Sequence, residues 1–287
     1  MTRRERQPYV GSRMARSRRA RRDVVRGGHD DRPARAVAVG LGKRDVVSAR
    51  IVVVEHQENC PSGLLGGWLV DAGAELDIVR PHQGEELPER ASYDALLVLG
   101  GDMGADDDDT VPWLAPVKKR IRREVESGTP VLGICLGHQL VAAALGGTVH
   151  PNPAGLTVGV QDVGWNAAAA TDPLFAGLLG AHRVVHWNDD IVVAPPPGTT
   201  VLATAADGSV QVARFGAAAW GIQAHPEVDA ALCRRWAAVD RDVHLAKGVD
   251  QDALVATIVR AADELERQWR PLGERFARLA VRVVGPQ

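Results

Sequence analysis

A cysteine lies between two glycines at the end of an apolar run. Residues 131–139 read VLGICLGHQ, which places Cys135 between Gly133 and Gly137. A side chain presented from a sharp strand-to-helix turn needs small residues on either side, because such a turn brings backbone segments close together. A helix that begins at Leu136 would point its positive end at Cys135 and favour the nucleophilic thiolate. The alternative is a small buried side chain, the usual state of a free cysteine.

A thiolate nucleophile needs a base, and a histidine with a nearby acid follows another predicted strand. The segment AAAWGIQAHPEVD contains His225, Pro226 and Glu227 directly after a strand predicted at Ala219–Gln223. Extended spacing places His225 and Glu227 on the same side of the chain, so Glu227 can bind one imidazole nitrogen while the other faces Cys135. By itself this segment also fits a surface turn. Together with Cys135, it indicates a nucleophile, a base and an orienting acid.

The elements around these residues alternate between strand and helix. Ile51–Glu55 is a β-branched run typical of a buried strand, and Pro61–Ala72 has apolar residues at helical spacing. Alternation of this kind predicts a mostly parallel sheet with helices on both faces and its chemistry at the carboxyl ends of the strands. Further strands are predicted at Glu75–Pro81, Asp94–Gly101 and Thr129–Cys135, with a helix at Pro112–Ser127.

Beyond Val149 the pattern changes to short strands, which are predicted to extend the sheet with antiparallel strands. Asp229–Val284 is predicted to form two or three amphipathic helices. No linker divides residues 51–287, so they are expected to be one domain with a helical extension from about residue 229. The short strands are expected near Thr157–Val163, Arg183–Trp187, Val201–Ala206, Val210–Phe215 and Ala219–Gln223.

The composition is that of a soluble globular protein with a basic N-terminus. The 287 residues are 45% hydrophobic and 24% charged, and residues 1–50 hold 15 Lys and Arg against 5 Asp and Glu. This Arg-rich extension is predicted to be disordered; contact with nucleic acid or an anionic surface, or a translation start at Met14, Val46 or Val47, are the alternatives. No apolar stretch approaches the roughly 20 residues that cross a bilayer. A cytoplasmic location is expected, with no nucleic-acid or membrane partner.

The other candidate features are expected to be structural. Cys60, Cys135 and Cys233 are widely spaced without a CxxC pair, so neither a disulfide framework nor a zinc ribbon is indicated. Cys60, Cys233 and the tryptophans are assigned to the core or to interfaces. Asp106–Asp109 is a run of acids in a predicted loop, and consecutive carboxylates cannot all face one ion, which favours a solvated turn. No metal and no cofactor are predicted.

The two motifs together resemble a known enzyme family. PVLGICLGHQL, followed about 90 residues later by GIQAHPE, is similar to the class I glutamine amidotransferases with a Cys-His-Glu triad. The resemblance covers roughly residues 51–230. It includes VLGGDMGADDDDTVPWL, which looks like the family's glycine loop, and VVHWNDD, which is similar to a segment of stand-alone members related to the GMP synthase glutaminase domain. The expected fold is a flavodoxin-like three-layer α/β sandwich with a mostly parallel sheet.

The resemblance implies hydrolysis of the side-chain amide of glutamine. Cys135 would attack the amide carbon, and His225 would protonate the departing ammonia and then activate water against the glutamyl thioester. Glu227 would orient His225. The backbone N–H groups of Gly101 and Leu136 would form an oxyanion hole, in which a single donor is typically worth about 3 kcal/mol.

Candidate substrate neighbours follow from the same resemblance. Gln139, one helical turn after Cys135, would either shape the glutamine pocket or brace the turn. The residues expected near the glutamine main chain are His186, Trp187 and Asn188.

Two positions depart from the family pattern. Ala224 stands where an aromatic residue more often precedes the histidine, which predicts a looser wall around His225. Asn188 stands where stand-alone relatives commonly carry histidine. Neither change removes a member of the triad.

The acceptor of the ammonia is left open. No P-loop, synthetase domain or second catalytic constellation is recognisable, so a partner synthase that receives the ammonia is predicted. One alternative is a γ-glutamyl peptide hydrolase that uses the same thioester. Another is a non-catalytic regulatory protein, against which the intact Cys135, His225 and Glu227 argue.

Overall fold

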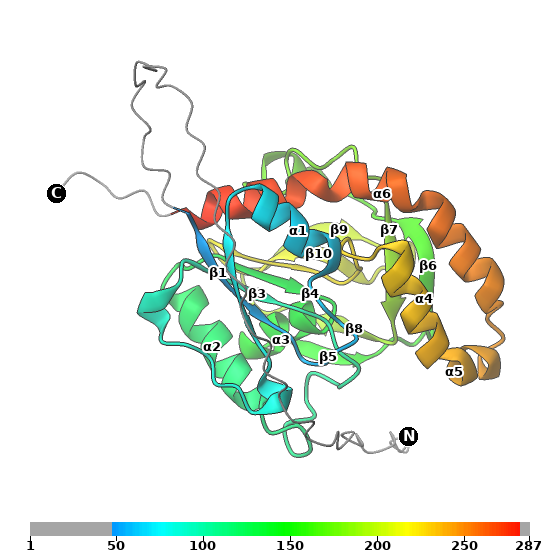
Figure 1. Ribbon diagram of the computed structural model, residues 1–287, viewed down its shortest axis with the longest axis horizontal. Helices are drawn as coiled ribbons and strands as arrows, with labels where there is room; N and C mark the ends of the chain where they lie inside the picture. Colours follow the sequence, from blue (N-terminus) through cyan, green and yellow to red (C-terminus); the bar gives the residue numbers. More distant parts are fainter. Residues whose placement is uncertain (1–47, 282–287) are drawn as a thin grey trace, which may run out of the picture. The chain divides into compact units, whose positions relative to one another are not determined.

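A seven-stranded sheet is the centre of the computed structural model, which describes residues 48–281 (Figure 1). The strand order is β2-β1-β3-β4-β11-β10-β9; the first five strands pair in parallel, and β10 and β9 are antiparallel. The predicted Arg-rich extension lies outside the described residues except for residues 48–50. The strands are β1 (Arg50–Val54), β2 (Glu75–Val79), β3 (Ala95–Val98), β4 (Val131–Ile134), β9 (Thr200–Thr204), β10 (Val210–Arg214) and β11 (Ala219–Ile222).

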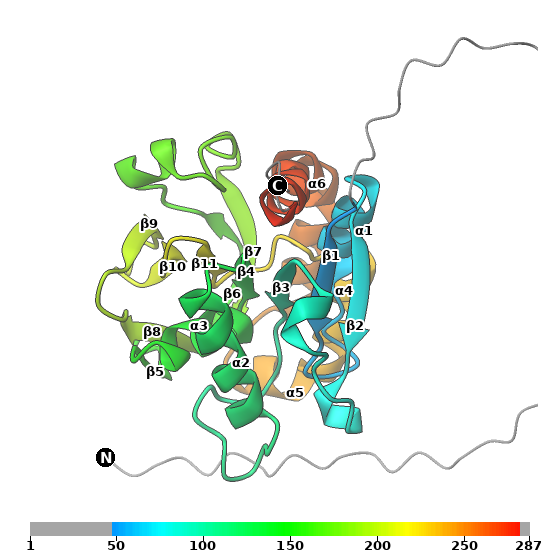
Figure 2. The same ribbon diagram turned by 90° about the vertical axis from the view of Figure 1, so that its left-hand side faces the viewer.

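Helices cover both faces of this sheet (Figure 2). In β1, Ile51 and Val53 pack in the core beneath α1 and α6, whereas Val52 and Val54 pack in the core beneath α2 and α3. Strands that are buried on both faces must be apolar throughout, which is why β1 is a continuous β-branched run. The four helices are α1 (Gly63–Asp71), α2 (Leu114–Glu126), α3 (Leu136–Ala144) and α6 (Gln251–Ala280).

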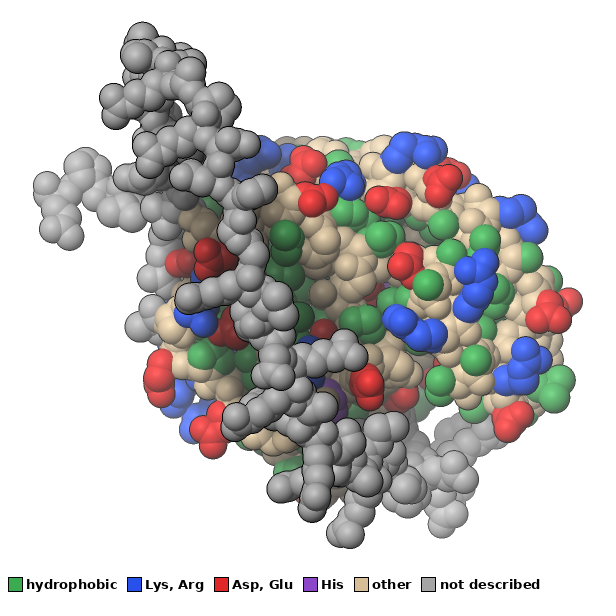
Figure 3. Space-filling model, in the orientation of Figure 1, with side chains coloured by type: hydrophobic (Ala, Val, Ile, Leu, Met, Phe, Trp, Pro, Cys, Tyr) green, Lys and Arg blue, Asp and Glu red, His purple; other side chains and the backbone are tan. Residues whose placement is uncertain are grey.

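The C-terminal stretch forms three helices, as predicted, because α4 (Ala230–Val239) and α5 (Arg241–Ala246) precede α6. The buried side of α6 includes Trp269, whose indole N–H donates to the carbonyl oxygen of Arg183 at 2.8 Å. On its outer side, acidic and basic side chains are interspersed (Figure 3). No helix within residues 48–281 is long and apolar enough to cross a membrane.

Two pairs of strands stand apart from the central sheet. β6 (Thr157–Asp162) pairs with β7 (Arg183–Asn188), and β5 (Thr148–Pro151) pairs with β8 (Asp190–Ala194). The second half extends the central sheet through β9, β10 and β11, as predicted, and the pairings of β10 are antiparallel. The predicted antiparallel orientation is wrong for β11, which pairs in parallel with β4, and the predicted place in the sheet is wrong for β6 and β7. The physical reason is that β6 and β7 pack against α6, so a helix covers this ribbon in place of the sheet.

Candidate active site

Cys135 lies at the turn between β4 and α3 in a backbone conformation that L-residues rarely adopt. Its φ is 51° and its ψ is −108°, and among residues 48–281 it is the one non-glycine residue with positive φ. The flanking glycines allow this turn. A Cβ on Gly133 would lie 2.7 Å from the backbone nitrogen of His138, and a Cβ on Gly137 would lie 2.7 Å from the carbonyl carbon of Val98. Strained backbone of this kind is concentrated at functional sites.

The pairing of β4 with β11 brings a histidine beside Cys135. Ile134 lies opposite Ile222 in the parallel register, and the Cys135 N–H donates to the Ile222 carbonyl oxygen at 2.8 Å. His225 follows Ile222 by three residues, and its N–H donates to the Val185 carbonyl oxygen of β7 at 2.7 Å. Two segments that are far apart in the sequence therefore meet at the carboxyl edge of the sheet.

Glu227 holds the imidazole of His225 in place. Its Oε1 lies 2.7 Å from Nδ1 of His225, and both side chains are buried. The first turn of α1 fixes the same loop, because the Leu64 N–H donates to the Glu227 carbonyl oxygen at 2.9 Å. Gly63, with a φ of 49°, leaves room for that carbonyl. Since Glu227 binds Nδ1, the other ring nitrogen is the one available to Cys135.

The charges around His225 make it a strong base. Burial by itself lowers the pKa of an imidazole, but the charges of Glu227 and Cys135 and their hydrogen bonds outweigh burial and raise the pKa of His225 to about 10. His225 is therefore protonated at neutral pH. Gln223 also reaches the nucleophile, with its side-chain amide donating to the Cys135 sulfur at 3.7 Å.

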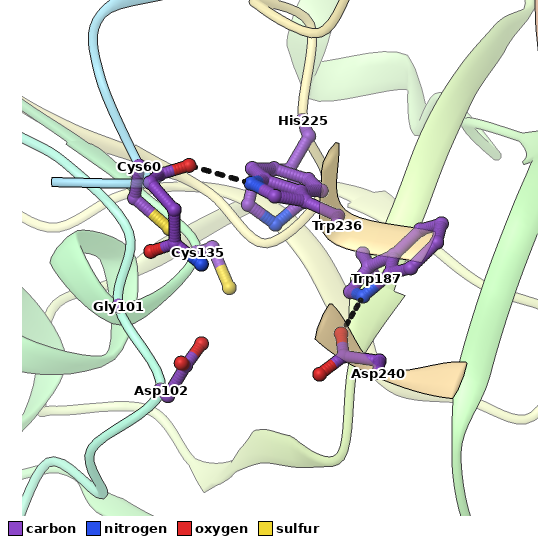
Figure 4. Close-up of a pocket in the computed structure, with 9 residues that line it drawn as sticks. Cys60, Gly101, Asp102, Cys135, Trp187, His225, Trp236 and Asp240 are labelled. Carbon is purple, nitrogen blue, oxygen red and sulfur yellow. Dashed lines mark hydrogen bonds between the residues drawn. The ribbon is translucent and has the colours of Figure 1, made fainter. Parts of the chain in front are cut away.

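Cys135 and His225 open onto a pocket (Figure 4). Gly101, one of the two predicted oxyanion-hole residues, lines this pocket beyond the end of β3. Leu136, the other, is the first residue of α3, where the N–H has no acceptor within the helix. The pocket is lined by Asn59, Cys60, Gly101, Asp102, Cys135, Trp187, His225, Trp236 and Asp240.

A protein-family model matches the part of the chain that contains Cys135, His225 and Glu227. The family model for glutamine amidotransferase class-I matches residues 66–232, which is more than half of the chain. The chain belongs to the class-I glutamine amidotransferase family. Both the strand-to-helix turn that presents Cys135, called the elbow below, and the histidine motif at His225 lie within the matched range.

The similar proteins include a GMP synthase subunit and a γ-glutamyl peptidase. This chain is 34% identical to a subunit of the glutamine-hydrolysing GMP synthase of Saccharolobus solfataricus, over 54% of this chain and 78% of that protein. It is 27% identical to γ-glutamyl peptidase 5 of Arabidopsis thaliana, over 71% of this chain and 82% of that protein. The crystal structure of a glutamine amidotransferase from Thermotoga maritima matches with a TM-score of 0.72 at 27% identity, covering 80% of this chain and 98% of that one. The predicted flavodoxin-like fold is confirmed.

The predicted substrate segment on β7 is divided between two faces of its strand. Trp187 lines the pocket, whereas His186 and Asn188 are not among its lining residues. Alternation along a strand explains the difference, because neighbouring side chains point to opposite faces. His186 is fully buried, and the Asn188 amide donates to the Asp190 carbonyl oxygen at 3.2 Å.

Gln139 lies behind the nucleophile and does not line the pocket. Its amide donates to the carbonyl oxygen of Asp190 at 3.0 Å and to Oε1 of Gln223 at 3.2 Å. Gln223 in turn contacts the Cys135 sulfur. These contacts fit the bracing role among the two roles that the sequence left open for Gln139.

The pocket also contains residues that the sequence interpretation did not select. Trp236 packs edge-on against His225 with ring centroids 4.7 Å apart, so α4 supplies an aromatic wall that Ala224 lacks. Asp240 ends α4 and lies about 100 residues beyond Cys135, where no local pattern marks it. Asp102 directly follows Gly101, and this adjacency is the only feature of the sequence that could have indicated a place for Asp102 in the pocket.

Besides His225, four histidines in the described part of the chain are buried, and burial lowers the pKa of each of them, His244 included. Burial lowers the pKa of His56 and His138 to about 3 and that of His186 to about 4. Below pH 6.5 the unfolded chain binds protons that the folded chain does not, so the free energy of unfolding is expected to fall as the pH drops towards 4. Each of the three histidines with a pKa of about 3 or 4 contributes about 1.4 kcal/mol per pH unit once the pH is below about 6. Well below pH 6.5 His225 adds nothing, because it is then protonated in both states.

Urea unfolding between pH 7 and pH 5 measures this effect. His138→Gln is expected to reduce the loss of stability by about 1.4 kcal/mol per pH unit relative to the wild type, whatever its stability at pH 7. The exposed residue His150 provides the control, and His150→Gln is expected to retain the wild-type slope. Equal slopes for His138→Gln and the wild type would contradict a neutral, buried His138.

Proposed function

We propose that this protein hydrolyses the side-chain amide of glutamine through a thioester on Cys135, releasing glutamate and ammonia. The observation that carries the proposal is the arrangement at the base of the pocket. Cys135 lies on a strained turn beside His225, and Glu227 holds the imidazole at 2.7 Å. A nucleophile, a base and an orienting acid in this order are what acyl transfer through a covalent intermediate requires.

The first half of the reaction forms the thioester. In the reacting state the Cys135 thiolate attacks the amide carbon of glutamine, and the amide oxygen becomes an oxyanion. The N–H groups of Gly101 and Leu136 stabilise this charge, in line with the position of Gly101 in the pocket. When the intermediate collapses, the imidazolium of His225 gives its proton to the departing nitrogen, ammonia leaves, and His225 becomes neutral.

The second half releases glutamate and restores the enzyme. Neutral His225 takes a proton from water, and the resulting hydroxide adds to the thioester carbon. Collapse of the second oxyanion expels the Cys135 thiolate and leaves His225 protonated again. Glu227 favours this protonated state, which is consistent with a pKa of about 10 for His225.

The ammonia is proposed to pass to a partner synthase. Support comes from the relative named as part of a GMP synthase, of which the chain covers 78%. The second candidate function is hydrolysis of γ-glutamyl peptides by the same thioester chemistry. It is favoured by the relative named γ-glutamyl peptidase 5, which matches over 71% of this chain.

A direct assay separates these functions. The purified protein is incubated with L-glutamine or with a γ-glutamyl dipeptide at equal concentration, and glutamate and ammonia are measured. Faster turnover of glutamine supports the amidotransferase half-reaction, whereas faster turnover of the dipeptide supports the peptide hydrolase. No turnover of either, together with no covalent capture of a glutamine-analogue electrophile at Cys135, would contradict both and leave the non-catalytic regulatory subunit.

A further inference from the structure

The side-chain amide of Gln223 lies against the sulfur of Cys135 in the interior of the protein. Gln223 follows Ile222, the last residue of β11, and its side chain is fully buried. Its Nε2 donates a hydrogen bond to the Cys135 sulfur at 3.7 Å. Because alternate residues of an extended segment share a face, Gln223 and His225 approach this sulfur from the same segment. The roles assigned above to Cys135, His225 and Glu227 leave Gln223 without one.

A second glutamine determines which end of this amide faces the sulfur. Gln139 on α3 donates through its Nε2 to the carbonyl oxygen of Asp190 at 3.0 Å. A carbonyl oxygen only accepts, so the end of the Gln139 amide beside it must be the amino group. The same Nε2 lies 3.2 Å from Oε1 of Gln223, which is the acceptor that an amino group requires. The amide of Gln223 is therefore oriented with its N–H groups towards Cys135.

The backbone around both glutamines holds them in this arrangement. The Gln223 N–H donates to the carbonyl oxygen of Gln211 on β10 at 2.8 Å, and the Gln139 N–H donates to the carbonyl oxygen of Cys135 at 3.1 Å. A buried amide that is hydrogen-bonded at both ends cannot turn over without losing these bonds, and each group left unsatisfied costs about 1–3 kcal/mol. Gln223 thus presents a fixed donor to the sulfur.

A fixed amide donor at the sulfur has a chemical consequence. A hydrogen bond to an ionised partner is about twice as strong as one between neutral groups, so this donor stabilises the thiolate more than the thiol. Together with the imidazolium of His225, it restricts where the sulfur lies when it attacks the amide carbon. A side-chain amide does not titrate, so Gln223 stabilises the thiolate without giving it a proton. The proton of His225 is then left for the departing nitrogen.

We propose that Gln223 is a positioning residue that holds the Cys135 thiolate for attack, and that Gln139 acts through Gln223 by fixing the direction of its amide. The inference rests on the proposed role of Cys135 as the nucleophile. It gives Gln139 a task in positioning the sulfur, in place of contact with the substrate. The chain of contacts leads from the Asp190 carbonyl oxygen through Gln139 and Gln223 to the sulfur.

The reactivity of the sulfur tests the donor without requiring turnover. Alkylation of Cys135 by iodoacetamide is followed by mass spectrometry as a function of pH, because the thiolate is the species that reacts. Gln223→Met keeps the approximate length of the side chain and removes the donor. The pH of half-maximal alkylation is expected to rise by about one unit in this variant. At neutral pH, kcat/KM for glutamine is expected to fall about tenfold for the same reason.

The titratable groups around Cys135 are unchanged in this variant and in the two that follow. They come from the loops after β1, β3 and β11, from the end of α4 and from β7. A shift in the pH of half-maximal alkylation therefore reports the loss of the amide donor. The groups are Cys60, Asp102, Asp240 and His225 in the pocket, with Glu227 and His186 beside His225.

A double-mutant cycle separates positioning from contact with the substrate. Gln139→Met is expected to lower kcat/KM about threefold and to raise the pH of half-maximal alkylation, because the Gln223 amide is then free to turn its oxygen towards the sulfur. The double variant is expected to match Gln223→Met, since a residue that acts only through Gln223 has no effect once that amide is gone. If the two effects multiply, Gln139 acts separately and the proposed chain of contacts is wrong.

Gln211→Met is the matched control, because Gln211 is a buried glutamine on the neighbouring strand β10. Its amide donates to the Ser209 hydroxyl at 2.9 Å, and it does not line the pocket. The substitution is expected to lower stability but to leave kcat/KM of the folded protein within about twofold and the alkylation profile unchanged. A profile shifted as far as that of Gln223→Met would attribute the shift to general damage to the core and would overturn the proposal.

The two readouts separate the inference from the proposed function. If the alkylation profile shifts in Gln223→Met while the wild type turns over neither glutamine nor the dipeptide, the function is overturned and the positioning role is supported. Normal turnover by the wild type with an unchanged profile in Gln223→Met would overturn the positioning role alone. Absent turnover with an unchanged profile would overturn both.

Discussion

Replacement of Cys135 by alanine is expected to abolish turnover of glutamine, with kcat falling at least about 10⁴-fold, because the covalent route is lost. The other thiol in the pocket is not expected to replace Cys135 as the nucleophile. Cys60 shares the pocket, but burial and the neighbouring charges raise the pKa of its thiol, so it stays protonated at neutral pH. The measurement is release of glutamate and ammonia, with covalent capture of a glutamine-analogue electrophile followed by mass spectrometry.

Cys233→Ala is the matched control for this variant. Cys233 is buried on α4 and does not line the pocket, so its loss is expected to leave kcat within about threefold of the wild type and the captured adduct on Cys135. Residual turnover in Cys135→Ala above about a hundredth of the wild-type rate would show that another group attacks the substrate and would contradict the assigned nucleophile.

Gly137→Ala is expected to destabilise the fold by about 3 kcal/mol and to lower activity at the same time. The new Cβ would meet the carbonyl group of Val98, and either β3 or the start of α3 must move. Movement of α3 displaces both the Leu136 N–H and the elbow that presents Cys135. Urea unfolding gives the change in stability, and kcat/KM measured under fully folded conditions gives the change in the site.

Gly67→Ala provides a control of opposite sign. Gly67 is an exposed residue within α1, and a Cβ there meets nothing within 4 Å. Alanine is expected to stabilise the protein by up to about 1 kcal/mol, because glycine loses more conformational freedom in a helix. If Gly137→Ala were as stable as the wild type, the close packing of α3 on β3 would not be what requires glycine at this position.

The elbow and the histidine motif are local features, and the sequence predicts them well. Gly133, Cys135 and Gly137 lie within five residues, so the need for small side chains at a sharp turn is visible from their spacing alone. His225 and Glu227 are separated by one residue, and extended spacing is enough to place both on one side. The alternation of strands and helices before Val149 also follows from periodicity, since each element is defined by residues close together in the chain.

Periodicity carried less information beyond Val149. The short strands there have the same alternation whether they extend the central sheet or form separate ribbons. β9 and β10 join β11, whereas β6 and β7 pair with each other and pack against α6. Whether a short strand joins the central sheet or a separate ribbon depends on which strands a helix packs against. For β6 and β7 that helix is α6, which begins about 90 residues after β6.

By itself, the sequence determined the parallel core, the turn that presents Cys135, and the pairing of His225 with Glu227. Only the tertiary structure decided which residues surround the nucleophile. Trp236 on α4 and Asp240 at its end line the pocket together with Trp187 and Asp102. Gln139 does not line the pocket, and its amide binds the carbonyl oxygen of Asp190. The physical reason is that a turn or a strand is set by neighbours in the chain, whereas the wall of a pocket is set by how distant helices and strands pack.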